Sequence, residues 1–151
     1  MSRMHIHIAT DSLEQSIRFY SVLFGAEPVV LKPDYAKWSL DNPSVNFAIS
    51  TRSKTTGLDH IGIQADSDEE QATIEARLKA ADIAGLAQQN TACCYARSDK
   101  YWVTDPQGIA WETFHSLGSI PTYGGEPDED RVTDSSCCAP LPGSVSNGCC
   151  S

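Results

Sequence analysis

An internal repeat places the strongest constraint on what this chain can fold into. Residues 5–12 (HIHIATDS) align with residues 60–67 (HIGIQADS) at an offset of 55, and five of the eight positions are identical. Each copy begins with alternating side chains, which is typical of a β-strand with one buried face. Each then continues into Asp-Ser, which is a helix-start signal. The repeat therefore predicts two related modules, at about residues 1–55 and 56–118.

The two modules carry the same order of expected elements. In both copies a serine and a Gln or Glu have the spacing of a capping box, namely Ser12 with Gln15 and Ser67 with Glu70. The first helix is amphipathic and is expected to end at Gly25, and the second near Gly85. The remaining strand-like runs are 28–31, 35–40 and 45–50, then 83–88, 92–96, 101–104 and 109–115, with 97–100 as a turn. The pattern predicts an α+β fold of paired βαβββ modules, in which each half-sheet curls into a cup.

Alternation directs the histidines of the repeated strands into this cup. His5 and His7 share one face of the first strand, and His60 occupies the position that matches His5. The opposite face is aliphatic and is expected to pack under the helices. Two histidines at matching positions of a duplication favour a shared site over two separate core histidines.

Glu112 is the candidate third member of this site. It lies in an otherwise apolar run, where an unpaired buried carboxylate would be costly. If Glu112 points inward, two imidazoles and one carboxylate suit Fe(II) or a similar divalent ion. The alternative is a structural salt bridge from Glu112 to Arg97 or Lys100.

The six cysteines form three adjacent pairs, which are Cys93-Cys94, Cys137-Cys138 and Cys149-Cys150. Adjacent cysteines rarely bond to each other, and the C-x₂-C spacing of zinc knuckles is absent. Paired thiols suit a soft ion such as As(III) or Cd(II), whereas the alternative is a buried pair and two oxidisable tail pairs. Strand alternation would separate Cys93 from Cys94, so their sulfurs reach one side only at a bulge or a loop edge.

The composition changes near Gly118. Residues 119–151 are rich in Gly, Pro, Ser and Asp, and they carry five acids against one base. Such a segment buries too little apolar surface to offset its ordering entropy, which predicts one domain over residues 1–118 and a flexible acidic tail. The net charge of −9 argues against nucleic acid or an anionic membrane surface as a partner. No apolar run is long enough for a transmembrane helix, and the N-terminus lacks a signal-peptide pattern, so a cytoplasmic location is expected.

Several segments resemble the vicinal oxygen chelate superfamily, which includes glyoxalase I, extradiol dioxygenases and fosfomycin-resistance enzymes. They are His5 with Asp11, 16–20 (SIRFY), 23–25 (LFG), 58–62 (LDHIG), and 105–108 (DPQG) ahead of Trp111-Glu112. The resemblance covers residues 4–115 and implies paired βαβββ modules around a metal ion.

A narrower resemblance points to the cadmium-induced protein and C–As lyase family. It rests on 90–96 (NTACCYA), 99–106 (DKYWVTDP), 1–3 (MSR), 32–36 (KPDYA) and the cysteine pairs of the tail. The resemblance implies a non-haem Fe(II)-dependent dioxygenase that cleaves the carbon–arsenic bond of trivalent organoarsenicals, such as methylarsenite and aromatic arsenicals, to inorganic arsenite. It implies His5, His60 and Glu112 as catalytic metal ligands, and Cys93 and Cys94 as the substrate site.

Other interpretations stay open at this stage. Ligand type alone does not separate Fe(II) from Ni, Co, Mn or Zn. The auxiliary thiols Cys137, Cys138, Cys149 and Cys150 either deliver a small-molecule arsenical or only sequester metal. The alternatives to a lyase are a cadmium- or arsenic-binding protein without turnover and a glyoxalase- or fosfomycin-type metalloenzyme. The protein is expected to be a monomer or a homodimer.

Overall fold

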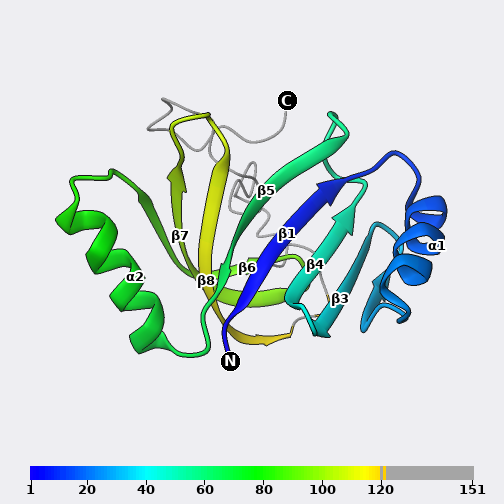
Figure 1. The fold of residues 1–151 in the computed structure, drawn as a ribbon, viewed down its shortest axis with the longest axis horizontal. Coiled ribbons are helices and arrows are strands. Elements are labelled where there is room, and N and C mark those ends of the chain that lie inside the picture. The colour runs from blue at the N-terminus through cyan, green and yellow to red at the C-terminus, as the bar shows by residue number, and fades with distance from the viewer. Residues whose placement is uncertain (120, 122–151) are drawn as a thin grey trace, which may run out of the picture.

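One curved, eight-stranded sheet with two flanking helices forms the part of the chain that the computed structural model describes, residues 1–119 and 121 (Figure 1). The order strand, helix, three strands occurs twice, as the repeat predicts. The elements are β1 (Arg3–Ala9), α1 (Leu13–Phe24), β2 (Val30–Lys32), β3 (Tyr35–Asp41), β4 (Ser44–Ser50), β5 (Gly57–Gln64), α2 (Asp68–Ala80), β6 (Leu86–Cys93), β7 (Ala96–Thr104) and β8 (Ala110–Ser119).

The two repeated strands lie side by side at the centre of the sheet. The strand order is β2-β3-β4-β1-β5-β8-β7-β6, with β1 parallel to β4 and β5 parallel to β8. Strands β1 and β5 pair antiparallel, in a register that sets His5 opposite Gly62 and His7 opposite His60. Both modules therefore belong to one sheet, and the inward histidines of the two copies become neighbours.

The helix signals of the sequence are confirmed in most details. Ser12 accepts a hydrogen bond from the backbone N–H of Gln15, and α1 ends at Gly25, which has a left-handed φ of 63°. The apolar face of α1 packs on the outer face of the sheet, over a core of Ile6, Ile8, Leu13, Ile17, Tyr20, Phe24, Trp38 and Phe47. Helix α2 stops earlier than predicted, at Ala80, because Asp82 turns the backbone left-handed with a φ of 56°.

The expected turn at 97–100 is wrong. Strand β7 runs through these residues, and the connection from β6 is the pair Cys94-Tyr95, with left-handed φ values of 54° and 61°. A two-residue loop with positive φ at both positions is the type I′ hairpin turn. The polar stretch resembles a turn because this part of the cup is itself polar: Ser98 and Lys100 are buried facing inward.

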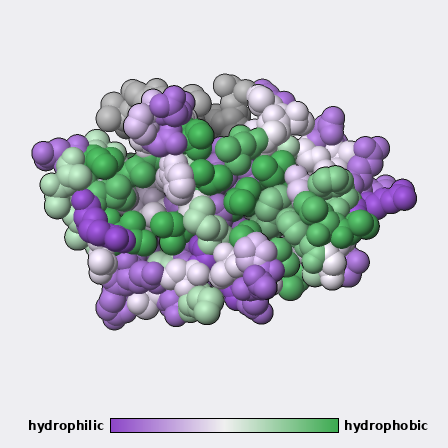
Figure 2. Space-filling model, viewed as in Figure 1, coloured by the Kyte–Doolittle hydropathy of each residue, from purple (hydrophilic) through white to green (hydrophobic). Residues whose placement is uncertain are grey.

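Apolar side chains also remain on the surface. In Figure 2 they gather in the middle of the face shown and over α1, where Phe19, Val22 and Leu23 are all more than half exposed. Neither helix of the described residues is long and apolar enough to cross a membrane.

Candidate metal centre and thiol pair

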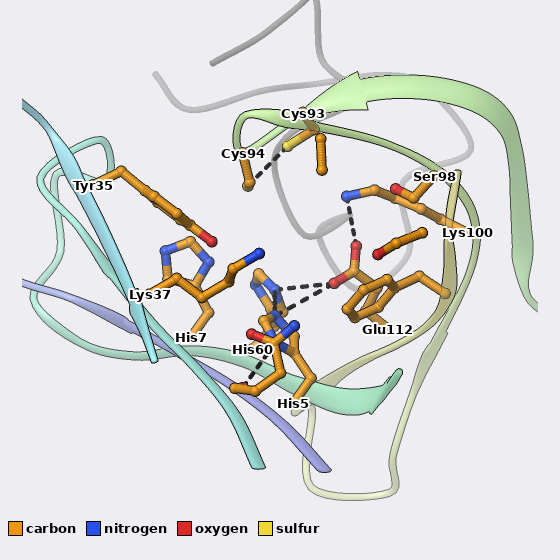
Figure 3. A pocket seen from close by; sticks show the side chains of 14 residues that line it. His5, His7, Tyr35, Lys37, His60, Cys93, Cys94, Ser98, Lys100 and Glu112 are labelled. Atoms are coloured by element: carbon orange, nitrogen blue, oxygen red, sulfur yellow. Dashed lines mark hydrogen bonds and ion pairs between the residues drawn. The ribbon is translucent and has the colours of Figure 1, made fainter. Parts of the chain in front are cut away.

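Three side chains from three strands converge inside the curved sheet (Figure 3). The Nε2 atoms of His5 and His60 lie 3.2 Å apart. The Oε2 atom of Glu112 lies 3.6 Å from the Nε2 of His5 and 3.3 Å from the Nε2 of His60. Ligands held at about 2.1 Å from one ion are themselves about 3.0–3.4 Å apart. The donor set therefore fits a single divalent ion with very little rearrangement, and Glu112 points inward as the sequence predicts.

Hydrogen bonds on the far side of each imidazole orient both rings toward this point. His5 Nδ1 lies 3.1 Å from the backbone oxygen of Asn46, and His60 Nδ1 lies 2.6 Å from Oδ1 of Asp59. In each pair Nδ1–H donates, which directs the Nε2 atom of the ring to the shared position. Such outer partners are typical of metal-binding histidines, because they fix the tautomer and the ring orientation.

The charges of the three candidate ligands are strongly coupled. Burial, together with the nearby His60, lowers the pKa of His5 to about 4, so this ring is neutral at pH 7. Burial also disfavours the cation of His60, but hydrogen bonds to Asp59 and Glu112 outweigh it and raise its pKa to about 9. Burial opposes ionisation of Glu112 as well, yet Lys100 and His60 hold its pKa well below the usual range. In the absence of an ion, a protonated His60 thus bridges His5 and two carboxylates.

Lys100 forms the salt bridge that the sequence offered as an alternative role for Glu112. Its Nζ lies 2.6 Å from Oε1 of Glu112, and both side chains are buried. The salt bridge and the metal site are compatible, because Oε1 faces the lysine while Oε2 faces the two imidazoles. Burial disfavours the Lys100 cation, but Glu112 and the nearby cysteines raise its pKa above the ordinary value.

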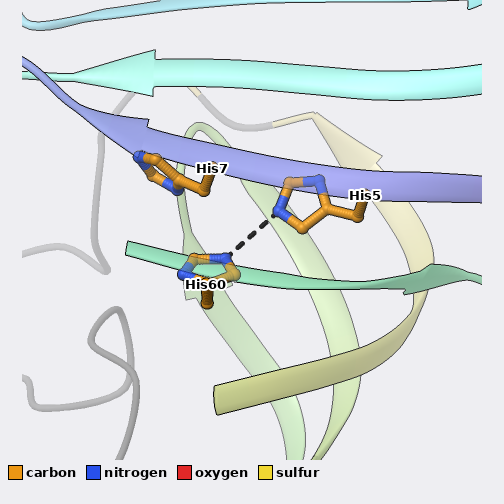
Figure 4. Close-up of side chains that lie close together, drawn as sticks. All are labelled: His5, His7 and His60. Atoms are coloured by element: carbon orange, nitrogen blue, oxygen red, sulfur yellow. Dashed lines mark hydrogen bonds between the residues drawn. The ribbon is translucent and has the colours of Figure 1, made fainter. Parts of the chain in front are cut away.

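His7 lies beside the same position (Figure 4). One ligand atom from each of His5, His7 and His60 can be chosen so that all three atoms lie within 4.8 Å of one another. The Nε2 of His7 is 2.9 Å from Oγ of Ser50, and its ring packs edge-on against His60 with centroids 4.8 Å apart. Burial and the nearby His60 lower its pKa to about 3, so His7 is a neutral neighbour of the candidate metal centre.

The thiol pair opens into the same pocket, where Cys93 and Cys94 lie across from the imidazoles (Figure 3). Their Sγ atoms are 3.0 Å apart, and neither is in a disulfide. Cys93 is buried and packs with Tyr35 and Ala48, while Cys94 is partly buried. The sequence predicts that both sulfurs lie on one side only at a bulge or a loop edge, and a loop edge is what the structure has. The left-handed backbone at Cys94 ends the alternation of β6, so the two sulfurs lie on the same side.

The comparisons with known proteins agree with this geometry. Residues 3–113 match the glyoxalase, bleomycin resistance protein and dioxygenase superfamily. The chain belongs to this superfamily. A protein of Bacillus sp. (strain MD1) named "Trivalent organoarsenical cleaving enzyme" is 39% identical over 100% of both chains. "Cadmium-induced protein CadI" of Mycobacterium bovis is 36% identical over 91% of this chain and 93% of its own.

A solved structure of the superfamily shows the same fold. The Mn(II)-bound glyoxalase of Novosphingobium aromaticivorans superposes with a TM-score of 0.56 at 18% identity, over 80% of this chain and 42% of that one. Together with the family match, this superposition confirms the vicinal oxygen chelate fold that the sequence predicts.

Several pocket residues of this superfamily member carry no sequence signal strong enough to find them. They are Tyr35, Lys37, Asn46, Ser98 and Ser116. Burial raises the pKa of Tyr35 well above its usual value and lowers that of Lys37. Polar residues at alternate positions of a strand, such as Tyr35 and Lys37 of β3, are a hint for some of them, but this pattern is equally typical of a solvent-facing strand.

The remaining candidate thiols belong to the predicted tail. Cys137, Cys138, Cys149 and Cys150 lie outside the described residues, as does almost all of the predicted tail. The candidate centre of this superfamily member is thus built from His5, His60, Glu112, Cys93 and Cys94.

Proposed function

We propose that this protein is a non-haem Fe(II)-dependent enzyme that cleaves the carbon–arsenic bond of trivalent organoarsenicals, with dioxygen as co-substrate, and releases inorganic arsenite. The observation that carries the proposal is a vicinal thiol pair and a two-His-one-carboxylate set in one pocket (Figure 3). The printed name of the 39% identical Bacillus relative supports the substrate class.

His5, His60 and Glu112 are the residues that would hold the ion. An Fe(II) ion in a two-His-one-carboxylate set keeps open coordination positions and supplies the redox chemistry by which dioxygen attacks organic substrates. The protein surrounds the imidazoles with aromatic rings: Phe114 packs on His5 and Trp102 on His60, each with centroids 5.1 Å apart. These rings exclude water from one side of the centre.

Cys93 and Cys94 would bind the arsenical. As(III) is soft and thiophilic, so both thiols replace the two hydroxyl groups of an R–As(OH)₂ molecule. Two As–S bonds form, two As–O bonds break, and the two thiol protons leave with the hydroxides as water. Because the sulfurs are 3.0 Å apart before binding, the pair is close to the arrangement that a single arsenic atom requires. Fixing the substrate in the pocket of the metal centre makes the later step effectively unimolecular.

The decisive experiment measures arsenite release. The protein is loaded anaerobically with Fe(II), trivalent methylarsenite is added, and air is then admitted. We expect arsenite from the wild type and none above background from Cys93→Ser or His60→Gln. His115→Gln is the matched control, because His115 lies outside the pocket lining and contacts the backbone oxygen of Ala65. Intact metal loading of the wild type without arsenite release would refute the assignment.

A second candidate is a cadmium- or arsenic-binding protein without turnover, which the name of the 36% identical CadI relative favours. It predicts stoichiometric binding of Cd(II) or arsenical and no oxygen uptake in the same experiment. Under either function, Cys137, Cys138, Cys149 and Cys150 serve as auxiliary thiols. Replacing these four residues by serine separates delivery, in which turnover at low substrate falls, from simple sequestration, in which it does not. Vicinal thiols stay reduced in the cytoplasm, which is the compartment that suits either activity.

A further inference from the structure

The turn that carries the thiols contacts the opposite module through one carboxylate. Asp34 lies in the turn between β2 and β3, and Tyr95 follows Cys94 in the turn between β6 and β7. The hydroxyl of Tyr95 donates to Oδ1 of Asp34 at 2.5 Å, and Nε of Arg52 donates to Oδ2 at 2.6 Å. Both carboxylate oxygens are therefore engaged, one by each module.

This contact joins the two ends of the sheet. Strands β2 and β6 are its edge strands, so the β2–β3 and β6–β7 turns are separated by the full width of the sheet along the hydrogen-bonded strands. Because the sheet curves, the turns meet, and Tyr95 reaches Asp34 over a sequence separation of 61 residues. Two more residues of the first module support Tyr95: the Nζ of Lys32 lies 5.2 Å from its ring centroid, and the ring of Tyr35 packs against it.

The conformation of the thiol turn (residues 93–95) depends on such support. Cys94 and Tyr95 both have left-handed φ values, which are unfavourable for residues with a side chain and persist where surrounding contacts enforce them. The same conformation brings the two sulfurs together on the pocket side. Strand β6, which leads into the turn, is an edge strand that pairs with β7 alone, and four of its eight residues are exposed, so it contributes limited restraint of its own.

The first module is anchored where it makes this contact. The backbone oxygen of Asp34 accepts a hydrogen bond from the N–H of Thr51 at 3.1 Å, next to Arg52. The carboxylate of Asp34 is only 26% exposed. Asp34 is thus a fixed acceptor, and the thiol turn is the part that it holds.

We propose that Asp34 is a positioning residue that, through the hydroxyl of Tyr95, holds the thiol turn over the metal centre. The proposal rests on the proposed function, in which the thiols bind the arsenical. Asp34 touches neither substrate nor ion in this role. It sets how close together the two sulfurs stay and where they stand relative to His5 and His60.

The test uses the full chain with Cys137, Cys138, Cys149 and Cys150 replaced by serine, so that a trivalent arsenical can bind only at Cys93-Cys94. The probe is phenylarsine oxide, and the variants are Asp34→Asn, Tyr95→Phe and the two combined. Asp41→Asn is the matched control, because Asp41 also pairs with an arginine, Arg3, at the far end of β3. Circular dichroism and thermal melting establish that each variant folds, and Tyr95→Phe removes only one oxygen atom.

We expect each single variant to weaken phenylarsine oxide binding about tenfold, the range of a hydrogen bond to a charged group. The double variant should bind no more weakly than the singles, since both substitutions break the same contact. Mn(II) affinity should change by less than about twofold in all variants, because the ligand residues are untouched, and Asp41→Asn should match the background chain.

Unchanged binding by both single variants, or independent and additive losses, would overturn the positioning role. Failure of the background chain itself to bind phenylarsine oxide would instead refute the thiol site of the proposed function. The two failures are therefore distinguishable.

Discussion

Binding of a divalent ion at neutral pH should release one proton, and that proton should come from His60. Hydrogen bonds to Asp59 and Glu112 overcome burial and raise the pKa of His60 to about 9, whereas burial and His60 keep the pKa of His5 near 4. An ion needs the lone pairs of both Nε2 atoms, so only His60 must lose a proton to bind it. The affinity should rise about tenfold per pH unit through the neutral range and level off around pH 9, which amounts to about 160-fold between pH 6.5 and 9.

The raised pKa of His60 has the opposite effect on the stability of the ion-free fold, which falls as the pH rises. A pKa raised from 6.5 to about 9 means that the folded state holds its proton more tightly than the unfolded state. The stabilisation from protonated His60 is complete below pH 6.5 and is lost as the pH rises through about 9. Alkaline conditions should therefore destabilise the ion-free protein while they strengthen ion binding.

Calorimetry with Mn(II) checks this prediction, because Mn(II) prefers oxygen and nitrogen donors and leaves the thiols aside. Titrations at pH 7.5 in buffers of different ionisation enthalpy give the number of protons released, which should be near one. Asp59→Asn should reduce this number, flatten the pH dependence and weaken binding about 10- to 100-fold. Asp68→Asn is the control, since Asp68 lies near His115, outside the pocket lining. Release of almost no proton by the wild type, or of equal numbers of protons by the wild type and Asp59→Asn, would refute the reasoning.

Two further substitutions test the packing and the charge balance of the centre. A Cβ atom on Gly62 would lie 1.8 Å from the backbone oxygen of Glu112, so Gly62→Ala should lower the unfolding free energy by about 2–3 kcal/mol. Gly118→Ala should not, because no atom lies within 4 Å of its Cβ; an equal loss in both would contradict the steric argument. Lys100→Met should leave the buried Glu112 carboxylate with His60 as its one remaining charged partner and destabilise the ion-free protein by about 3 kcal/mol, with recovery on adding Mn(II). Thermal melting measures both effects. Lys79→Met is the control for Lys100→Met, because Lys79 belongs to an exposed ion pair, and it should leave the melting temperature unchanged. A Lys100→Met protein with an unaltered melting temperature would mean that Glu112 is neutral.

The histidine pair could be predicted because a duplication repeats the strand face as well as the residues. His5 and His60 match at the repeat offset, and the pairing of β1 with β5 then makes neighbours of them. Glu112 was accessible to the same reasoning, since a carboxylate in an apolar run requires a buried partner. These inferences use only local periodicity and the cost of burying charge.

The conformation of the thiol turn and the position of Lys100 on a strand could not be predicted in this way, although Lys100 was one of the two salt-bridge partners expected for Glu112. Cys94-Tyr95 contains none of the Gly or Asn residues that usually allow a type I′ turn. Its conformation is supported instead by contacts from the first module, which no local pattern encodes. Lys100 lies in a polar stretch that resembles a turn, but the polar groups face a polar pocket rather than solvent.

The register of the sheet gives each inward residue of one module a counterpart in the other. In the first module Ile6 pairs with Phe47, and in the second module the matching residue Ile61 pairs with Trp111. The next residue along each partner strand, Ala48 in the first module and Glu112 in the second, therefore occupies the equivalent position. An approximate two-fold axis thus passes between β1 and β5, through the histidine pair, and strict symmetry would place a carboxylate on each side of it. Ala48 provides no donor atom, and Cys93 packs against it instead. The loss of symmetry at this one position gives the two sides of the axis different chemistry, an anionic oxygen on one and a thiol on the other.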